Sequence, residues 1–361
     1  MKSTRLYFID AVRAFAIIMM LQGHFINTTL ASGYKNDSSL TYIIWKYFRG
    51  NTAPLFFAIS GLIFVYLLLK AQEKSLDNPR VKKGLKRGLQ LIGIGYLLRI
   101  PFLGWITGYF DTYFLVIDVL QCIGLSLILI ILIYLLVQKN RIALSLTFFV
   151  LGALSFLTEP IFRDLTIQNT PEFLTNYITT QNGSIFTIIP WFGFMAFGGF
   201  IATLFYKNSH KSHFKTIAIS MLITVGLLLM FLSTDLLLKL YELTQLELIN
   251  ECAQFNYLFI RLGNVLVVFG LFYALENQLK HHIISIIGKN TLAIYVAHFI
   301  ILYGSFIGYG LKDIFKNNLN PYEAFIGAVL FVFVCCWLVL NLGKIKLLIS
   351  DLYTKLRSKM N

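Results

Sequence analysis

Long apolar runs separated by short polar segments are the dominant pattern of the chain. About twenty mainly apolar residues in a helix cross a bilayer, so the pattern predicts about ten transmembrane helices. The predicted spans cover residues 9–30, 52–71, 86–105, 114–137, 142–158, 186–206, 214–234, 257–276, 284–305 and 323–342, the fifth being short. No soluble domain, flexible linker or internal repeat interrupts them. We therefore predict an all-α, polytopic fold with a single transmembrane domain over residues 1–361.

Basic residues are distributed unevenly between alternate polar segments. If the N-terminus faces the cytoplasm, the predicted inner segments hold 21 of the 31 Lys and Arg residues. The outer segments then hold 7, and the remaining 3 lie within spans. Because cytoplasmic loops carry such an excess, both termini are predicted to be cytoplasmic. We expect a multi-pass protein of the plasma membrane, which is the inner membrane in a cell that has two.

Composition agrees with a membrane protein and narrows the partners. Hydrophobic residues make up 57% of the chain and charged residues 13%, so the lipid bilayer is the main expected partner. The net charge of +14 could indicate nucleic-acid binding, but the basic residues lie in short loops between spans, and no nucleic-acid partner is expected. The four cysteines lack the spacing of a zinc site, so no metal is expected.

The first span carries a polar stripe that a simple membrane anchor would not have. Arg13 and His24 are eleven positions apart, about three full helical turns, so both side chains leave the same face. Asp10, Asn27 and Thr28 extend that face in steps of three or four. Lipid cannot satisfy such groups, and ionisable residues within membranes usually serve function. A purely structural histidine is the alternative, which Arg13 on the same face disfavours.

Five predicted spans bring an ionisable residue to a similar depth near the outer side of the membrane. With a rise of about 1.5 Å per residue, His24, Arg99 and His298 lie at one level on spans that run outward. Asp118 and Arg261 reach the same level on spans that run inward. The net positive charge of this layer suits an anionic ligand, such as a phosphorylated cofactor held by guanidinium groups. A histidine there could act as a general base on a hydroxyl or amine.

Structural explanations for the same residues stay open. Arg99 and Arg261 could extend to the outer lipid headgroups. Asp118 could begin a helix, with Gln121 one turn later as its partner. His298 could belong to a hydrogen-bonded seam between helices.

Two further signals are weaker. Ser60-Gly61 in the second span is more typical of close helix packing than of chemistry. The basic run Arg80–Arg87 is explained by membrane topology, and it also suits acidic headgroups or a cofactor that arrives from the cytoplasm.

A resemblance to a known family rests on several motifs in a fixed order. The first span resembles the opening of the membrane-bound acyltransferases related to heparan-alpha-glucosaminide N-acetyltransferase and to the acyltransferase-3 family. The matching residues there are a basic residue, an aspartate, and an arginine ahead of a histidine: Arg5, Asp10, Arg13 and His24. Similar later segments begin at Ala53, Asp118, Ile189 and Gly288, the last ending at His298.

The resemblance implies transfer of an acyl group, usually acetyl from acetyl-CoA, onto a carbohydrate at the membrane. It implies His24 as the catalytic residue, with Arg13 supporting His24 or the path of the acyl donor. Two departures limit it. The Arg-x-x-Arg of acyltransferase-3 proteins is replaced by Lys83-Gly84-Leu85-Lys86-Arg87. The loop that distinguishes the animal lysosomal enzyme is missing after the first span, so heparan-like acceptors cannot be inherited.

These observations favour an acyltransferase that uses acetyl-CoA or another acyl-CoA and modifies a glycan or glycolipid acceptor. His24 is the predicted base, while His298 and Arg99 steady the developing oxyanion or the CoA phosphates. Arg99, Arg261 and Asp118 form the predicted cofactor-binding set. A transporter or channel for an anionic solute is the alternative, followed by a lipid-modifying or scaffold protein. Homo-oligomerisation stays open.

Overall fold

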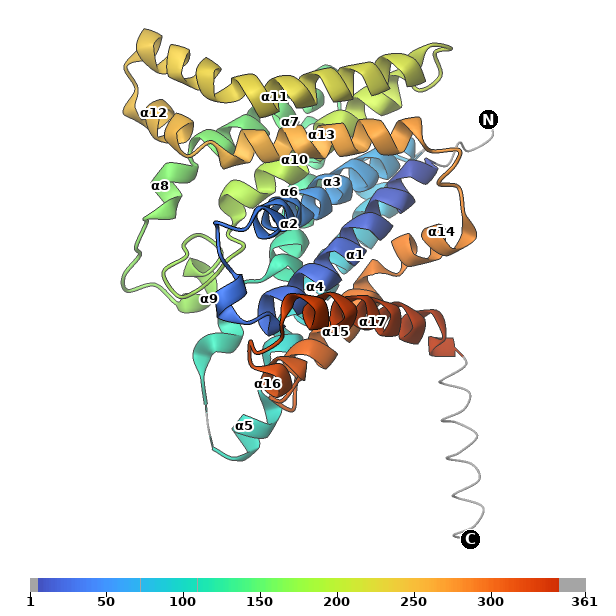
Figure 1. Ribbon diagram of the computed structural model, residues 1–361. Coiled ribbons are helices and arrows are strands. Elements are labelled where there is room, and N and C mark those ends of the chain that lie inside the picture. Colours follow the sequence, from blue (N-terminus) through green and yellow to red (C-terminus); the bar gives the residue numbers. More distant parts are fainter. Residues whose placement is uncertain (1–5, 72, 109, 344–361) are drawn as a thin grey trace.

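A computed structural model describes residues 6–71, 73–108 and 110–343. Within these ranges the fold is all-helical, with one isolated β-bridge between Leu30 and Leu319 and no strand, which confirms the predicted fold class (Figure 1). Arg5 of the resemblance and the basic residues of 344–361, which entered the prediction of orientation, lie outside the described residues.

The long helices follow the apolar runs of the sequence. They are α1 (Tyr7–Thr29), α3 (Thr52–Lys70), α4 (Pro79–Arg99), α6 (Val119–Val137), α7 (Arg141–Leu157), α10 (Ile188–Asn208), α11 (Phe214–Thr244), α13 (Tyr257–Ala274), α15 (Thr291–Tyr303) and α17 (Pro321–Leu340). Shorter helices connect them: α2 (Leu40–Gly50), α5 (Phe102–Ile106), α8 (Glu159–Arg163), α9 (Glu172–Thr175), α12 (Glu247–Gln254), α14 (His282–Lys289) and α16 (Leu311–Phe315). Three 3₁₀ turns are η1 (Ser32–Tyr34), η2 (Ser75–Asp77) and η3 (Thr112–Leu115).

Each of the ten predicted spans coincides with a helix, with two notable differences. Helix α11 continues to Thr244, ten residues beyond the predicted end, because helix-forming Leu, Lys and Glu residues follow the apolar run. The predicted span 284–305 is broken into α14 and α15, which are bent by 68°. The break lies at Asn290, whose backbone leaves the helical region.

Length and composition qualify seven helical segments of the described chain as membrane spans, or eight if α14 and α15 form one bent span. Helix α4 fails this test because it carries several cations, and α7 fails because it has 17 residues. The protein is therefore a multi-pass membrane protein, while the count of ten spans and the orientation remain predictions. We call the end of the bundle at the start of α1 the inner end, and the end at Thr29 the outer end.

Glycines let pairs of helices approach closely. A Cβ atom at Gly61 of α3 would collide with the carbonyl oxygen of Met195 in α10, and a Cβ at Gly198 would collide with that of Ala58. The packing role predicted for Ser60-Gly61 is confirmed for Gly61. Reciprocal glycine contacts also join α4 to α6 and α11 to α13. Small residues serve this purpose in membranes, where lipid provides no hydrophobic drive for helix association.

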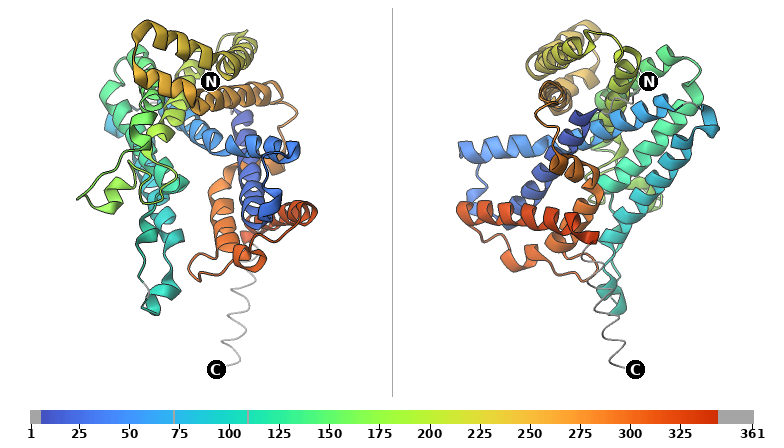
Figure 2. Two further views of the ribbon diagram at one scale, coloured as in Figure 1. Left: turned by 60° about the vertical axis from the view of Figure 1, so that its left-hand side comes forward. Right: turned by 90° about the vertical axis from the view of Figure 1, so that its right-hand side faces the viewer.

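The helices form two groups with a cavity between them. Helices α3, α4, α6, α7 and α10 pack on one another, and α1, α14, α15 and α17 form the second group (Figure 2). The antiparallel pair of α11 and α13 crosses the edge of the bundle, where α13 contacts both α1 and α3 (Figure 1). Large apolar side chains of α11 such as Phe231 and Leu236 stay exposed, as expected of a face that meets lipid.

Candidate active site

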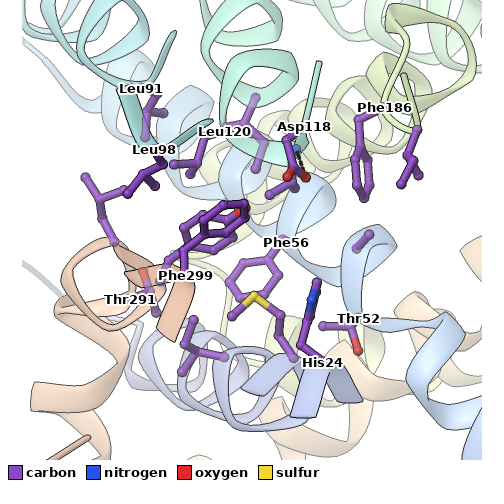
Figure 3. A pocket seen from close by; sticks show the side chains of 18 of the residues that line it. His24, Thr52, Phe56, Leu91, Leu98, Asp118, Leu120, Phe186, Thr291 and Phe299 are labelled. Carbon is purple, nitrogen blue, oxygen red and sulfur yellow. Dashed lines mark hydrogen bonds between the residues drawn. The ribbon is translucent and has the colours of Figure 1, made fainter. Parts of the chain in front are cut away.

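A cavity of about 880 Å³ lies between the two helix groups and extends along α1 and α4 (Figure 3). On α1 it is lined from Arg13 to His24, eleven residues or roughly 16 Å of helix. On α4 it is lined from Arg87 to Arg99, twelve residues or roughly 18 Å. The cavity therefore covers about half of the membrane thickness or more.

His24 lies in the wall of the cavity near its outer end. Its Nδ1 atom is 2.6 Å from the hydroxyl oxygen of Tyr303. The ring is half-buried and shares its part of the wall with Phe56 and Thr52 (Figure 3). Because Nδ1 is occupied by Tyr303, the other nitrogen, Nε2, is the atom left for chemistry.

The position of Tyr303 follows from the way α15 ends. Tyr303 is the last residue of the helix, and Gly304 follows with φ +70°, a left-handed conformation that favours glycine. A side chain at Gly304 would also collide with the backbone of Tyr309. The phenol ring packs on Phe299 one turn earlier, with 4.9 Å between ring centroids. The turn and this stacking hold the hydroxyl beside His24.

His298 lies behind His24 and is fully buried, outside the cavity wall. The centroids of the two imidazole rings are 5.3 Å apart, in an edge-on arrangement. Nδ1 of His298 contacts the carbonyl oxygen of Tyr295, so this nitrogen carries the proton and donates it. Nε2 is then a bare acceptor, and it has no partner among the described residues. Neutral His298 thus has no N–H to offer the oxyanion predicted for it.

Arg99 and Asp118 form an ion pair at the outer end, with 3.0 Å between Nη2 and Oδ2. The other carboxylate oxygen of Asp118 accepts the backbone N–H of Val119 at 2.8 Å, and Gln121 completes a capping box at the start of α6. The guanidinium of Arg99 also lies over the ring of Tyr113, 5.1 Å from its centroid. Asp118 therefore pairs with Arg99 and also begins a helix, as the structural alternative from the sequence proposed.

Two more arginines reach the outer end of the cavity. Arg49, at the end of α2, donates from Nη1 to Oδ1 of Asn27 at 2.5 Å and lies over the ring of Trp45. Arg261, in the first turns of α13, lies over the ring of Tyr257 and close to the backbone of Gly50. Neither arginine pairs with a carboxylate of the described chain.

The inner part of the cavity is lined by Arg13 and Arg87. Nη2 of Arg13 donates to the hydroxyl of Thr291 at 2.8 Å, which joins α1 to the start of α15. Arg87 donates from Nη1 to Oε1 of Gln90 at 3.1 Å. Both of these hydrogen-bond partners are neutral groups.

Cations outnumber acids in the cavity wall. Among the described residues, the wall contains five arginines and Lys312, but Asp118 is its one carboxylate. Groups of three or more His, Cys, Asp or Glu side chains suited to a metal ion do not occur in the described part of the chain. Electrostatically, the cavity is suited to an anionic ligand.

The structure brings most of the predicted site residues together. Four of them, His24, Arg99, Asp118 and Arg261, line the outer end of one cavity, and Arg13 lines its inner part. His298 reaches the predicted depth but lies behind His24. Sequence reasoning missed Arg49 and Tyr303 as site residues. Arg49 was only one of the 7 basic residues assigned to the outer segments, and no local signal marks Tyr303.

Comparison with known families gives one match. The model for a family described as "Heparan-alpha-glucosaminide N-acetyltransferase, catalytic" matches residues 5–245, two thirds of the chain. No curated protein matches the sequence. The matched part includes His24, Arg13, Arg99 and Asp118, whereas Arg261 and α15 lie beyond it.

Proposed function

The chain belongs to the family of heparan-alpha-glucosaminide N-acetyltransferase catalytic domains, and we propose that it transfers an acyl group, most simply acetyl, from acyl-CoA to a sugar. The acceptor group is a hydroxyl or amine of a glycan that is extracytoplasmic or linked to the membrane. Family membership supports an acetyltransferase of the membrane. The donor, the acceptor and the residue roles below are parts of the proposal.

The observation that carries the proposal is that one cavity connects the cationic inner part to His24. CoA carries its phosphates and its thioester at opposite ends of a long, flexible arm. Arg13 and Arg87 suit the phosphates, because guanidinium groups bind them through charge-assisted hydrogen bonds. The thioester of a donor held in this way lies in the outer part of the cavity, close to His24.

In the proposed reaction, His24 acts as a general base through Nε2. This role requires the tautomer in which Nδ1–H donates to the hydroxyl oxygen of Tyr303, 2.6 Å away, and Nε2 carries the free lone pair. Nε2 accepts the proton of the acceptor hydroxyl or amine as its oxygen or nitrogen attacks the thioester carbon. The C–S bond then breaks, and the CoA thiolate leaves and takes up the proton from His24.

Tyr303 corresponds in this scheme to the orienting member of a catalytic triad, although its oxygen is a neutral acceptor rather than a carboxylate. His298 packs edge-on against the His24 ring and is a positioning residue. Arg99 is neutralised by Asp118, so we assign this pair to the shape of the site rather than to the donor phosphates.

The excess of cations in the cavity also fits the alternative of a transporter for an anionic solute. Thiol release distinguishes the two functions. Purified protein in detergent is incubated with acetyl-CoA and a panel of amino sugars, neutral sugars and acidic sugars, and free CoA thiol is measured. Acceptor-dependent release of thiol requires an enzyme. Binding of acetyl-CoA without any acceptor-dependent release over the whole panel would contradict the proposed function.

A further inference from the structure

Arg49 and Arg261 lie close together at the outer end of the cavity, next to the catalytic candidate. A Cβ atom at Gly50 would lie 2.9 Å from Nη2 of Arg261, so this guanidinium rests on the residue that follows Arg49. The stem of Arg49 packs against Gly23, since a Cβ there would lie 3.0 Å from its Cγ. Gly23 directly precedes His24 in α1.

Both guanidinium groups are held by neutral partners. Arg49 is fixed by Asn27 and by the face of Trp45, 5.3 Å from its ring centroid. Arg261 is fixed by the face of Tyr257 at 5.1 Å. Neutral partners orient a guanidinium but leave its charge uncompensated, and several N–H donors stay available on each group.

The positive charges of Arg49 and Arg261 repel each other, and further cations nearby increase this repulsion. Lys312 also lines the outer end. Lys35 lies in the nearby outer loop, and partial burial, with a contribution from Arg49, lowers its pKa. Within the described chain, the one carboxylate of the wall, Asp118, is already paired with Arg99. A bound anion would remove this repulsion.

Donor phosphates do not account for this second group of cations. If the donor phosphates bind Arg13 and Arg87, they lie roughly 16 Å along α1 from His24 and the outer end of the cavity. Extension of the two arginines to lipid headgroups is also a poor description, because both line the cavity with His24. The outer cations therefore face the side from which the acceptor reaches the thioester.

We propose that Arg49 and Arg261 form a subsite for an anionic group of the acceptor, which makes the acceptor an acidic sugar bearing a phosphate, sulfate or carboxylate. This inference rests on the proposed function for the direction in which the donor lies. It moves Arg261 from the donor, where the sequence placed it, to the acceptor.

The test is binding of radiolabelled glucose 6-phosphate to the purified protein, without donor, in competition with unlabelled glucose. These probes differ only in the phosphate. Wild-type protein is expected to prefer the phosphate by about tenfold or more, the effect of one or two charge-assisted hydrogen bonds. Arg49→Gln and Arg261→Gln should each remove most of this preference. Lys46→Gln is the matched control, because Lys46 is on the same helix as Arg49 but points outward to Asp37 and should leave the preference unchanged.

Affinity for CoA is measured on the same samples, and it should be equal in wild type and Arg261→Gln. A loss of CoA affinity in Arg261→Gln with no change in sugar phosphate binding would return Arg261 to the donor and overturn the inference, leaving the proposed function intact. An equal loss of the phosphate preference in Lys46→Gln would show that the overall positive potential of the outer end causes it, and would overturn the inference of a subsite. Wild-type protein that binds glucose and glucose 6-phosphate equally would also overturn it.

Lipid headgroups are separated from acceptors by repeating the binding in nanodiscs. The phosphate preference should persist in phosphatidylcholine discs and in discs that contain phosphatidylglycerol. If phosphatidylglycerol abolishes it, the anion site belongs to lipid and the inference is wrong. Should either Gln variant fail to fold, Arg49→Lys and Arg261→Lys replace it, since they keep the charge but lose the planar fork; an unchanged preference in both would overturn the inference.

Discussion

Nη2 of Arg99 lies 3.0 Å from Oδ2 of Asp118, across two helices that meet at the outer end of the cavity. The side chains are only 10% and 17% exposed, so each partner compensates a charge that water can solvate only in part. Because of this pair, Arg99 differs from the four other arginines of the wall, none of which forms a salt bridge with an acid of the described chain.

Asp118 has two roles that substitution can separate. Asp118→Asn keeps an oxygen for the N–H of Val119 but leaves Arg99 unpaired, and we expect a loss of roughly 3 kcal/mol in stability. Asp118→Ala also removes the cap and should lose about 1 kcal/mol more. Thermal unfolding of both variants in detergent measures the difference. An Asn variant as stable as wild type would show that the pair does not stabilise the fold.

His24→Ala should reduce acyl transfer by about 10²–10⁴, the usual contribution of a general base. Affinity for CoA and the amount of protein in the membrane should stay near normal, because the proposed reaction places His24 at the reacting end of the donor only. His210→Ala is the control, as His210 is exposed in the loop between α10 and α11. Activity of His24→Ala within a few-fold of wild type would exclude His24 as the base.

Tyr303→Phe keeps the ring on Phe299 and removes the hydroxyl that contacts Nδ1 of His24. We expect kcat to fall about tenfold, equivalent to one hydrogen bond, with CoA affinity unchanged. Steady-state kinetics and a separate CoA binding measurement distinguish an effect on kcat from an effect on CoA affinity. Tyr309→Phe, at an exposed tyrosine of the same loop region, should behave as wild type. A variant that loses CoA affinity but keeps kcat would place Tyr303 on the donor.

Arg87→Gln should weaken CoA binding about tenfold or more, since it removes charge-assisted hydrogen bonds to phosphate in the inner part of the cavity. Lys86→Gln removes the same charge from the exposed side of α4 and should have little effect. Calorimetric titration of CoA into both variants makes the comparison at constant ionic strength. Equal losses of CoA affinity in the two variants would indicate general attraction to a basic surface. If both variants bind CoA as tightly as wild type, Arg87 does not belong to the donor site.

Gly198→Ala should destabilise the protein by about 1–3 kcal/mol, because the added methyl group collides with the carbonyl of Ala58 and forces α3 and α10 apart. Gly93→Ala is the matched control. A Cβ there meets nothing within 4 Å, and the gain in helix propensity makes this change neutral or slightly stabilising. Melting temperatures that fall equally in the two variants would contradict the close approach of the helices.

The sequence was informative about helices and about residues on one helix. Apolar runs locate the spans, and the period of the helix puts Arg13 and His24 on one face, where both line the cavity. The depth argument also brought His24, Arg99, Asp118 and Arg261 to one end, because rise per residue is the same in every helix. These are properties of single helices combined with topology.

Features that depend on contacts between helices were not accessible in this way. Depth does not determine rotation about the helix axis, so His298 was placed correctly in height but lies behind His24. Arg49 lies near the end of α2, and its side chain is held in the cavity wall by contacts with Trp45 and with Asn27 of α1. The break at Asn290 has no proline to announce it, and it arises where α14 packs against the start of α1 at Gly288.

That break makes α15 a separate short rod, and both ends of the rod are fastened to the same neighbour. Its first residue, Thr291, accepts the hydrogen bond of Arg13, and its last, Tyr303, contacts His24. Twelve residues, or roughly 18 Å, separate these two attachments. A rigid rod cannot tilt or slide without changing the distances at both ends. Arg13, which we propose faces the donor, and His24, which we propose faces the acceptor, are thereby mechanically linked, without any side chain running between them.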